Sequence, residues 1–294
     1  MSPQAEVLCS GAPRDLGLDQ GLRFREVIRA EVWRLRGKWT WRLRAPLAGR
    51  DPEAARLARD TARFFPHLAE RAQGIARGAR VSTAELATLL ACECSRESET
   101  LVGARAEAAG SGASIALLTG REAPLFVRRS EPESGYRSLE IGIPWRASAL
   151  AGVNERGLAV AGSPLAFSSA PLPTCAAPAV LLVQDCLQRF DRVEKALEWC
   201  ECRPAGGSAS ILMADARGTL ARVDLAGGRR RIHRELDGIL LCGGEPNRLA
   251  SVEKACRASQ QLDAAGLLRA LAALGGRALA LDPNDPERIF GDLP

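Results

Sequence analysis

Few side chains in this chain have the neighbours that a nucleophile needs. Ser114 lies in a short apolar run next to Ala113, and its hydroxyl is the nearest nucleophilic group there. A serine attacks an amide or ester carbonyl only when a base activates it. The two histidines, His67 and His233, lie far apart in the sequence. The chain therefore has little material for a Ser/His/Asp triad or a histidine-based metal site.

Cysteine is the other candidate nucleophile or metal ligand. The chain has nine cysteines, and two pairs have C-x-C spacing, Cys92/Cys94 and Cys200/Cys202. Zinc and redox motifs are typically spaced C-x-x-C, and a disulfide within a C-x-C pair is geometrically poor. We interpret the cysteines as reduced side chains that pack as small apolar groups. No metal and no cofactor is expected.

A β-hairpin predicted over residues 112–131 would position Ser114. Two apolar runs, 115–118 and 125–127, flank a Thr-Gly-Arg-Glu turn. Apolar runs separated by a short glycine-containing turn are typical of hairpins. Successive side chains of a strand point to opposite faces, so Ser114 should face away from Ala113.

Four motifs occur elsewhere in the chain. They are a glycine/proline pattern at Gly11, Pro13, Gly17 and Gly21; GIARGARV followed by Glu85-Leu86; GVNERGL at 152–158; and ADARG at 214–218, followed by Asp224. In this order, and with the hairpin, they resemble the isopenicillin N acyltransferase family of N-terminal-nucleophile (Ntn) hydrolases. The resemblance implies an α+β fold, a four-layer αββα sandwich. Residues 1–112 would form a helical segment equivalent to a pro-region, residues 113–294 the sandwich core, and the two together one structural unit.

The resemblance also assigns catalytic positions, and this chain departs from them. The family nucleophile is a cysteine freed by self-cleavage, and its new α-amine serves as the base. Ala113 stands at that position, Glu131 replaces the family aspartate, and Arg129 replaces the asparagine before it. The oxyanion asparagine of the family's Thr-Asn-His falls on Gly243. Arg128 is retained, as in the bile-salt hydrolases.

The same resemblance predicts where the cleft lies. Ala113, Glu131, Asn154 and the Gly243-Gly244 turn should bound it, with Ser114, Arg128 and Arg129 in its lining. If Glu131 is buried beside Arg128 or Arg129, it should pair with that arginine. Two other nucleophiles, Cys94 and Ser98, would come into question if the hairpin began one strand earlier.

Periodicity predicts the remaining elements. Asp51-Pro52 should begin an amphipathic helix with a kink at Pro66, and Ser82 with Glu85 should form a capping box. A helix is expected over 180–200, four short strands over 209–214, 220–225, 230–234 and 239–242, and a helix over 262–274 before a last hairpin near 282–286.

Composition limits the classes of protein. With 294 residues, 46% of them hydrophobic, the chain can bury a large core. Its longest apolar stretch, at 176–183, is much shorter than the roughly 18 to 20 residues of a membrane span. The N-terminus lacks a secretory pattern, so we expect a cytoplasmic protein without membrane association. The charge of +5 comes from scattered arginines, and we expect no nucleic-acid binding.

We therefore predict a catalytically silent member of this fold that binds a small molecule or a protein partner. The alternative is an active amide hydrolase or acyltransferase that uses a nonstandard residue such as Ser114 or Cys94. The sequence does not identify the ligand or the partner, and it leaves open whether the protein is a homo-oligomer.

The first prediction concerns the bond between Gly112 and Ala113. Ala113 has no thiol or hydroxyl for an acyl shift, so the chain should remain intact at this bond, and intact-mass spectrometry checks this. Ala113→Cys should also remain uncleaved, because Gly243 and Gly244 offer no side-chain amide and loss of one oxyanion donor costs about 100- to 1000-fold. A split at residue 112 in the wild-type protein would contradict this account.

Overall fold

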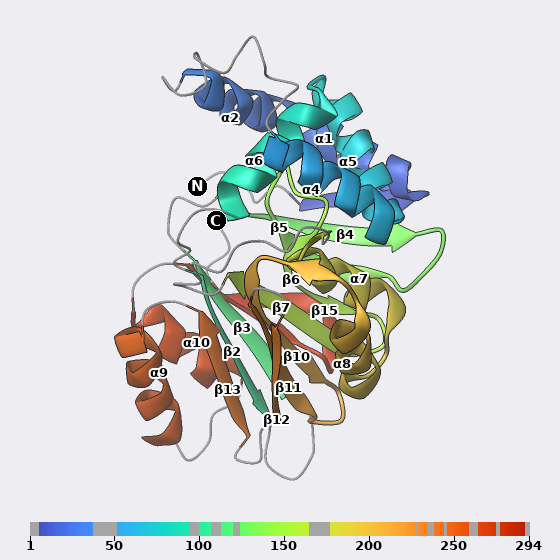
Figure 1. The fold of residues 1–294 in the computed structure, drawn as a ribbon. Helices are drawn as coiled ribbons and strands as arrows, with labels where there is room; N and C mark the ends of the chain where they lie inside the picture. Colours follow the sequence, from blue (N-terminus) through green and yellow to red (C-terminus); the bar gives the residue numbers. More distant parts are fainter. Residues whose placement is uncertain are drawn as a thin grey trace.

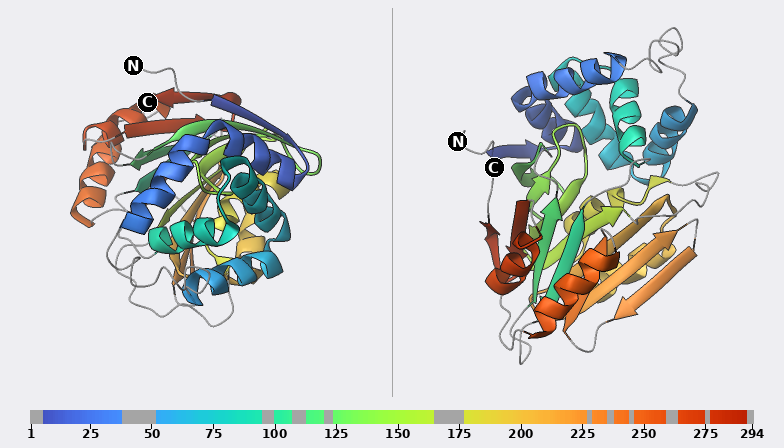
Figure 2. Two further views of the ribbon diagram at one scale, coloured as in Figure 1. Left: turned by 90° about the horizontal axis from the view of Figure 1, so that it is seen from above. Right: turned by 90° about the vertical axis from the view of Figure 1, so that its left-hand side faces the viewer.

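Two sheets face each other in the computed structural model, with helices on the outer side of each (Figures 1 and 2); all their strand pairs are antiparallel except β1–β4, which is parallel. The structure describes residues 6–37, 52–94, 100–106, 113–119, 124–164, 177–226, 229–234, 238–243, 246–258, 264–274 and 277–291. The eight-stranded sheet has the order β1-β4-β5-β6-β7-β10-β11-β12, and the five-stranded sheet β13-β2-β3-β14-β15. The predicted four-layer αββα fold is confirmed.

The strands of the eight-stranded sheet are β1 (Glu6–Gly11), β4 (Phe126–Pro132), β5 (Ser138–Gly142), β6 (Ala149–Asn154), β7 (Leu158–Pro164), β10 (Ser208–Asp215), β11 (Leu220–Ala226) and β12 (Arg229–Arg234). Those of the five-stranded sheet are β2 (Leu101–Ala106), β3 (Ala113–Thr119), β13 (Ile239–Gly243), β14 (Arg277–Asp282) and β15 (Asp285–Gly291). A small parallel pair, β8 (Ala177–Pro178) and β9 (Ala205–Gly206), lies apart from both sheets.

Helices cover the outer faces of the sandwich. The N-terminal group, above the sheets in Figure 1, comprises α1 (Pro13–Arg23), α2 (Arg25–Gly37), α4 (Pro52–Phe64), α5 (Pro66–Ala79) and α6 (Thr83–Cys94). Helices α7 (Leu181–Arg189) and α8 (Val193–Cys202) pack on the eight-stranded sheet, and α9 (Pro246–Ala258) and α10 (Ala264–Ala272) on the five-stranded sheet. None of the helices in the described ranges is long and apolar enough to cross a membrane.

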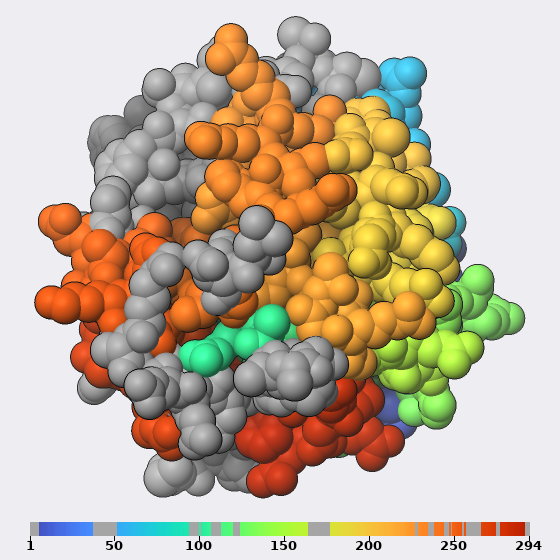
Figure 3. All heavy atoms as spheres, turned by 90° about the horizontal axis from the view of Figure 1, so that it is seen from below, coloured from blue at the N-terminus to red at the C-terminus, as the bar shows by residue number. Residues whose placement is uncertain are grey.

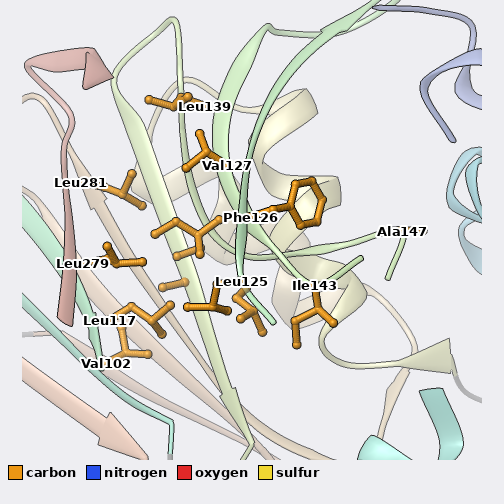
Figure 4. Close-up of a cluster of buried hydrophobic side chains, with 14 of the residues drawn as sticks. Val102, Leu117, Leu125, Phe126, Val127, Leu139, Ile143, Ala147, Leu279 and Leu281 are labelled. Atoms are coloured by element: carbon orange, nitrogen blue, oxygen red, sulfur yellow. The ribbon is translucent and has the colours of Figure 1, made fainter. Parts of the chain in front are cut away.

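The space between the sheets is filled by apolar side chains. Figure 4 shows Leu117, Leu279 and Leu281 of the five-stranded sheet facing Val127 and Leu139 of the other. These side chains alternate along β4 and β5 with polar ones, Arg128 and Glu140, which therefore lie on the outer face beneath the helices. At β4 and β5, the eight-stranded sheet thus has an apolar inner face and a polar buried outer face.

Most local predictions are confirmed. Helix α4 begins at Pro52, and Pro66 ends the first helical run and starts α5. In the capping box of α6, the backbone N–H of Ser82 donates to Glu85 at 2.8 Å and that of Glu85 donates to the Ser82 hydroxyl at 3.2 Å. The helix predicted over 180–200 is instead two helices, because the chain is extended at Phe190 and Arg192.

The predicted hairpin over 112–131 is wrong. Strand β3 pairs with β2 and β14, whereas β4 belongs to the other sheet and pairs with β1 and β5. All seven residues of β3 are buried, since it is an inner strand packed between α10 and the opposite sheet. The antiparallel pair formed with its preceding strand is therefore β2–β3, one strand earlier in the chain.

Helices α1 and α5 touch through glycines. A Cβ on Gly74 would lie 2.0 Å from the Arg14 carbonyl oxygen, and one on Gly17 would lie 1.9 Å from that of Arg71. Gly21 and Gly78 have similarly close backbone neighbours at this contact. The glycine motifs found in the sequence therefore allow one close helix crossing.

The second prediction tests this crossing. Gly74→Ala should lower the free energy of unfolding by at least about 1–3 kcal/mol, because the helices must move apart. The control is Gly37→Ala at the end of α2, where a Cβ meets nothing within 4 Å. Urea unfolding measures both, and equal stability of the two variants would contradict the close crossing.

Candidate active site

The end of β13 meets the start of β2 at one end of the sandwich. Gly243 pairs with Leu101, and the Ser163 hydroxyl donates to the Thr100 carbonyl at 2.7 Å. Gly243 has φ +83°, and a Cβ there would lie 2.1 Å from the Ser163 oxygen and 2.2 Å from the Thr100 oxygen. Only glycine fits, so the oxyanion position assigned by the family resemblance has no room for a side chain in this geometry.

Ala113 lies at the other end of the same sheet. It pairs with Ala106, five residues along β2 from Leu101, so Ala113 and Gly243 are separated by roughly 17 Å along the strand direction at about 3.3 Å per residue, and they lie on strands on opposite sides of β2. The view from below shows a small green patch of β2 at the surface, beside the orange strands (Figure 3). The structure therefore does not bring Ala113 and Gly243 together, and the cleft predicted between them is not formed.

Other predicted cleft residues have separate structural roles. The Asn154 amide nitrogen donates to the carbonyls of Leu187 and Phe190, while its oxygen accepts the N–H groups of Arg156 and Leu158, which fixes the β6–β7 turn. Ser114 is buried, and its hydroxyl has no hydrogen-bond partner in the described part of the chain. Gly244, Ser98 and the side chain of Cys94 lie outside the described residues.

The two arginines of β4 pair with residues other than Glu131. Arg129 is exposed and contacts Glu6 at 2.5 Å, and Glu131 is itself exposed. Arg128 is fully buried and donates to Glu140 at 2.5 Å. Glu131 therefore does not take the buried pairing considered for it.

The Arg128–Glu140 pair is surrounded by amides and a hydroxyl. Arg128 also donates to Gln20 of α1 at 2.5 Å and to Gln184 of α7 at 2.9 Å. Glu140 accepts from Gln184 at 2.7 Å and from Ser138 at 2.5 Å. Burial alone would raise the pKa of Glu140, but Arg128, Arg71 and these hydrogen bonds hold it below its usual value. This network joins helices to the sheet, and nothing in it is open to a substrate.

A second polar cluster faces the space between the sheets, close to Gly243. Asp224 accepts a hydrogen bond from Ser210 at 2.5 Å and lies 2.8 Å from His233 Nε2, and Arg222 donates to it at 3.1 Å. The serine donates to the aspartate and not to the histidine, so this set does not form a triad with an activated serine. The sequence did not point to it, because its members come from three strands.

The thiol of Cys242 completes this cluster. It is buried, and burial raises its pKa to about 12, although Arg222 opposes the shift. Because the thiolate is the nucleophilic form, Cys242 is inert at neutral pH. The Ser163 hydroxyl thus donates to a backbone carbonyl, the Ser210 hydroxyl donates to the Asp224 carboxylate, and Cys242 is a protonated thiol.

An apolar cavity of about 180 Å³ lies between the N-terminal helices and the loop 143–148. Leu57, Leu86 and Leu90 line it with Trp145 and Ser148. Ser148 is 1% exposed, and its hydroxyl has no hydrogen-bond partner among the described residues. An engineered apolar cavity of about 150 Å³ holds benzene, so this one has room for a small aryl or short acyl group.

Solved structures share this arrangement of sheets and helices. An N-acylethanolamine-hydrolyzing acid amidase ortholog from Caenorhabditis elegans matches with a TM-score of 0.54 at 9% identity, over 65% of this chain and 99% of that one. The chain has the fold of the Ntn hydrolases. Penicillin V acylase from Agrobacterium tumefaciens matches with a TM-score of 0.47 at 15% identity, over 63% of this chain and 80% of that one.

A conjugated bile acid hydrolase mutant from Clostridium perfringens matches with a TM-score of 0.37 at 16% identity, over 52% of this chain and 57% of that one. No protein-family model and no curated protein sequence matches the chain. The likeness to the Caenorhabditis elegans structure, at 9% identity, shows the fold alone, and the chemistry has to be argued from the residues.

The third prediction concerns the buried ion pair. Glu140→Gln leaves the Arg128 charge without its carboxylate and should cost about 3–5 kcal/mol of unfolding free energy. Glu131→Gln, which removes an exposed carboxylate from the neighbouring strand, is the control and should change little. Chemical unfolding at neutral pH compares them.

The pH dependence of Glu140→Gln gives an independent readout. A folded-state pKa below the unfolded value means that the pair stabilises the protein fully above the unfolded pKa of about 4.3, and that this stability is lost as the pH falls through the folded pKa. The stability gap between wild type and Glu140→Gln should therefore narrow in acid. A constant gap would contradict the assigned charge state.

Proposed function

We propose that the protein is a catalytically silent member of the Ntn-hydrolase fold that binds a small molecule bearing an aryl or short acyl group. The carrying observation is the apolar cavity beneath α4, α5 and α6, with the unpartnered hydroxyl of Ser148 in its wall. An unsatisfied buried hydroxyl costs free energy, which a ligand amide or carbonyl would recover by hydrogen bonding to it. Apolar pockets with one or two convergent polar groups are typical of small-molecule sites.

The side chains described near Gly243 support the proposal that the protein lacks catalytic activity. The Ser163 and Ser210 hydroxyls donate to a carbonyl and a carboxylate, the Cys242 thiol is protonated, and Gly243 has no side chain to stabilise an oxyanion. An amide hydrolase requires both an activated nucleophile and oxyanion donors. The described residues at this end provide no activated nucleophile.

The alternative is an amide hydrolase or acyltransferase with a nonstandard nucleophile. One observation favours it: the β2–β3 pairing makes the start of β2, not Ala113, the strand end beside Gly243. Ser98 and Cys94, which precede β2, are then the candidates, and Ser114 is not, because it lies near the far end.

The fourth prediction tests binding in the cavity. Phenylacetamide should bind to the wild type in a calorimetric titration, and Ala87→Leu, which fills the cavity from α6, should abolish binding without loss of stability. Ala30→Leu at an exposed position of α2 is the matched control and should bind normally. Ser148→Ala should bind about tenfold more weakly, the effect of one hydrogen bond. Equal binding by Ala87→Leu and wild type would show that phenylacetamide does not bind in this cavity.

Product analysis of the same mixtures separates the two functions. A catalytically silent protein should release no more phenylacetic acid than the protein-free control. Release of acid that persists in Ser114→Ala and is lost in Ser98→Ala or Cys94→Ala would overturn the proposal in favour of the hydrolase.

A further inference from the structure

Arg71 of α5 is a buried charge with most of its donors unused. Its side chain is 1% exposed, and one guanidinium nitrogen, Nη2, donates to the Ser130 hydroxyl at 2.9 Å. Nε and Nη1 have no hydrogen-bond partner within the described ranges. Burying a charge is costly unless it is paired and hydrogen-bonded. Apart from the Cys9 thiol, which makes a hydrogen bond with Arg71, the described residues offer these donors no acceptor.

Glu140, the buried carboxylate whose charge acts on Arg71, already pairs with another arginine. Glu140 pairs with Arg128 at 2.5 Å, so two buried guanidinium groups share one buried carboxylate. The Cys9 thiol lies beside both arginines, but burial raises its pKa, and it remains neutral at pH 7. Burial lowers the pKa of Arg71 only to about 10, which leaves it charged under the same conditions. One positive charge in this cluster is uncompensated.

Arg71 lines a cavity of about 380 Å³ on the outer face of the sheet. The start of α1, the start of α5, the β4–β5 turn and the end of α7 surround this cavity. His67 also lines it, and its Nε2 has no hydrogen-bond partner, although the Asp185 carboxylate lies 3.3 Å away. Arg189 adds a guanidinium that is held by Asp185 at 2.6 Å.

Helix geometry adds to the positive potential. Pro13 and Pro66, the first residues of α1 and α5, both line the cavity. Proline has no N–H to donate, but the positive end of each helix dipole favours anions here. The acidic residue in the lining, Glu133, is exposed on the β4–β5 turn.

We propose that this cavity is an oxyanion-binding site, in which a carboxylate or phosphate group accepts hydrogen bonds from Arg71 and His67. The site lies outside the Ser148 cavity, with Leu68 of α5 contributing to the walls of both. It is independent of the function proposed above. The ligand is a small anion or the anionic group of a larger molecule.

Thermal unfolding at fixed ionic strength tests the site. A ligand that binds only the folded state raises the melting temperature with concentration. Inorganic phosphate and acetate, each exchanged against chloride, are the two probes, and acetamide is the uncharged control. We expect at least one anion to raise the melting temperature of the wild type and acetamide to leave it unchanged. The anion with the larger effect identifies the group.

Variants assign the effect to the cavity. Arg71→Met should fold, since it removes an uncompensated buried charge, and should abolish the anion-dependent rise. If it does not fold, variants of the exposed β4–β5 turn test the site instead. Ser134→Glu should lower the affinity for the anion about tenfold or more, and Glu133→Gln should raise it. Glu131→Gln, two residues from Glu133 and outside this cavity, should match the wild type.

Three outcomes would overturn the proposal. They are no rise with either anion in the wild type, an equal rise in Arg71→Met, and equal responses of Ser134→Glu and Glu131→Gln. A negative result with the anions would not bear on phenylacetamide binding, because the Ala87→Leu comparison tests the other cavity.

Discussion

The buried pair of Arg128 and Glu140 fixes the positions of two helices, α1 and α7, on the eight-stranded sheet. Two opposite charges with no access to water are tolerated only when their remaining donors and acceptors are met. Gln20 and Gln184 meet them, and these residues belong to α1 and α7. A displacement of either helix would leave a buried charged group without one of its hydrogen-bond partners, so both helices are held at defined places on the sheet.

The same residues control the loop between β5 and β6. The Gln20 amide donates to the carbonyls of Pro144 and Arg146 at 2.8 and 2.9 Å. The Trp145 indole donates to Glu93 at 2.7 Å, near the end of α6. This loop carries Ser148, and α6 precedes the strand that meets Gly243. The buried ion pair thus orients the cavity wall and the chain that leads into the candidate active site.

Sequence reasoning found most of the elements because their local causes are strong. The capping residues of α6, Pro52 at the start of α4 and the glycines of α1 and α5 each act on their own segment or on one contact. The prediction of a hairpin over 112–131 was wrong for the opposite reason. The apolar runs 115–118 and 125–127 fit a strand in either sheet, and burial of β3 on both faces is decided by α10 and the opposite sheet, which lie far away in the sequence. Glu140, Gln184 and Gln20 were missed likewise, because an isolated polar residue in an apolar run gives no sign of its partner.

The strand pairing changes what Ala113 says about the site. If Ala113 lay beside the oxyanion position, an alanine in place of the family cysteine would mean that a single substitution had removed the nucleophile. In the structure Ala113 is far from Gly243, so its methyl group says nothing about that end of the sandwich. The stronger evidence is steric: Ser163 and Thr100 occupy the space that a side chain on residue 243 would need. Backbone and side chains around Gly243 are packed for a glycine, so restoring an asparagine there would require Ser163 to break its hydrogen bond to Thr100 and move.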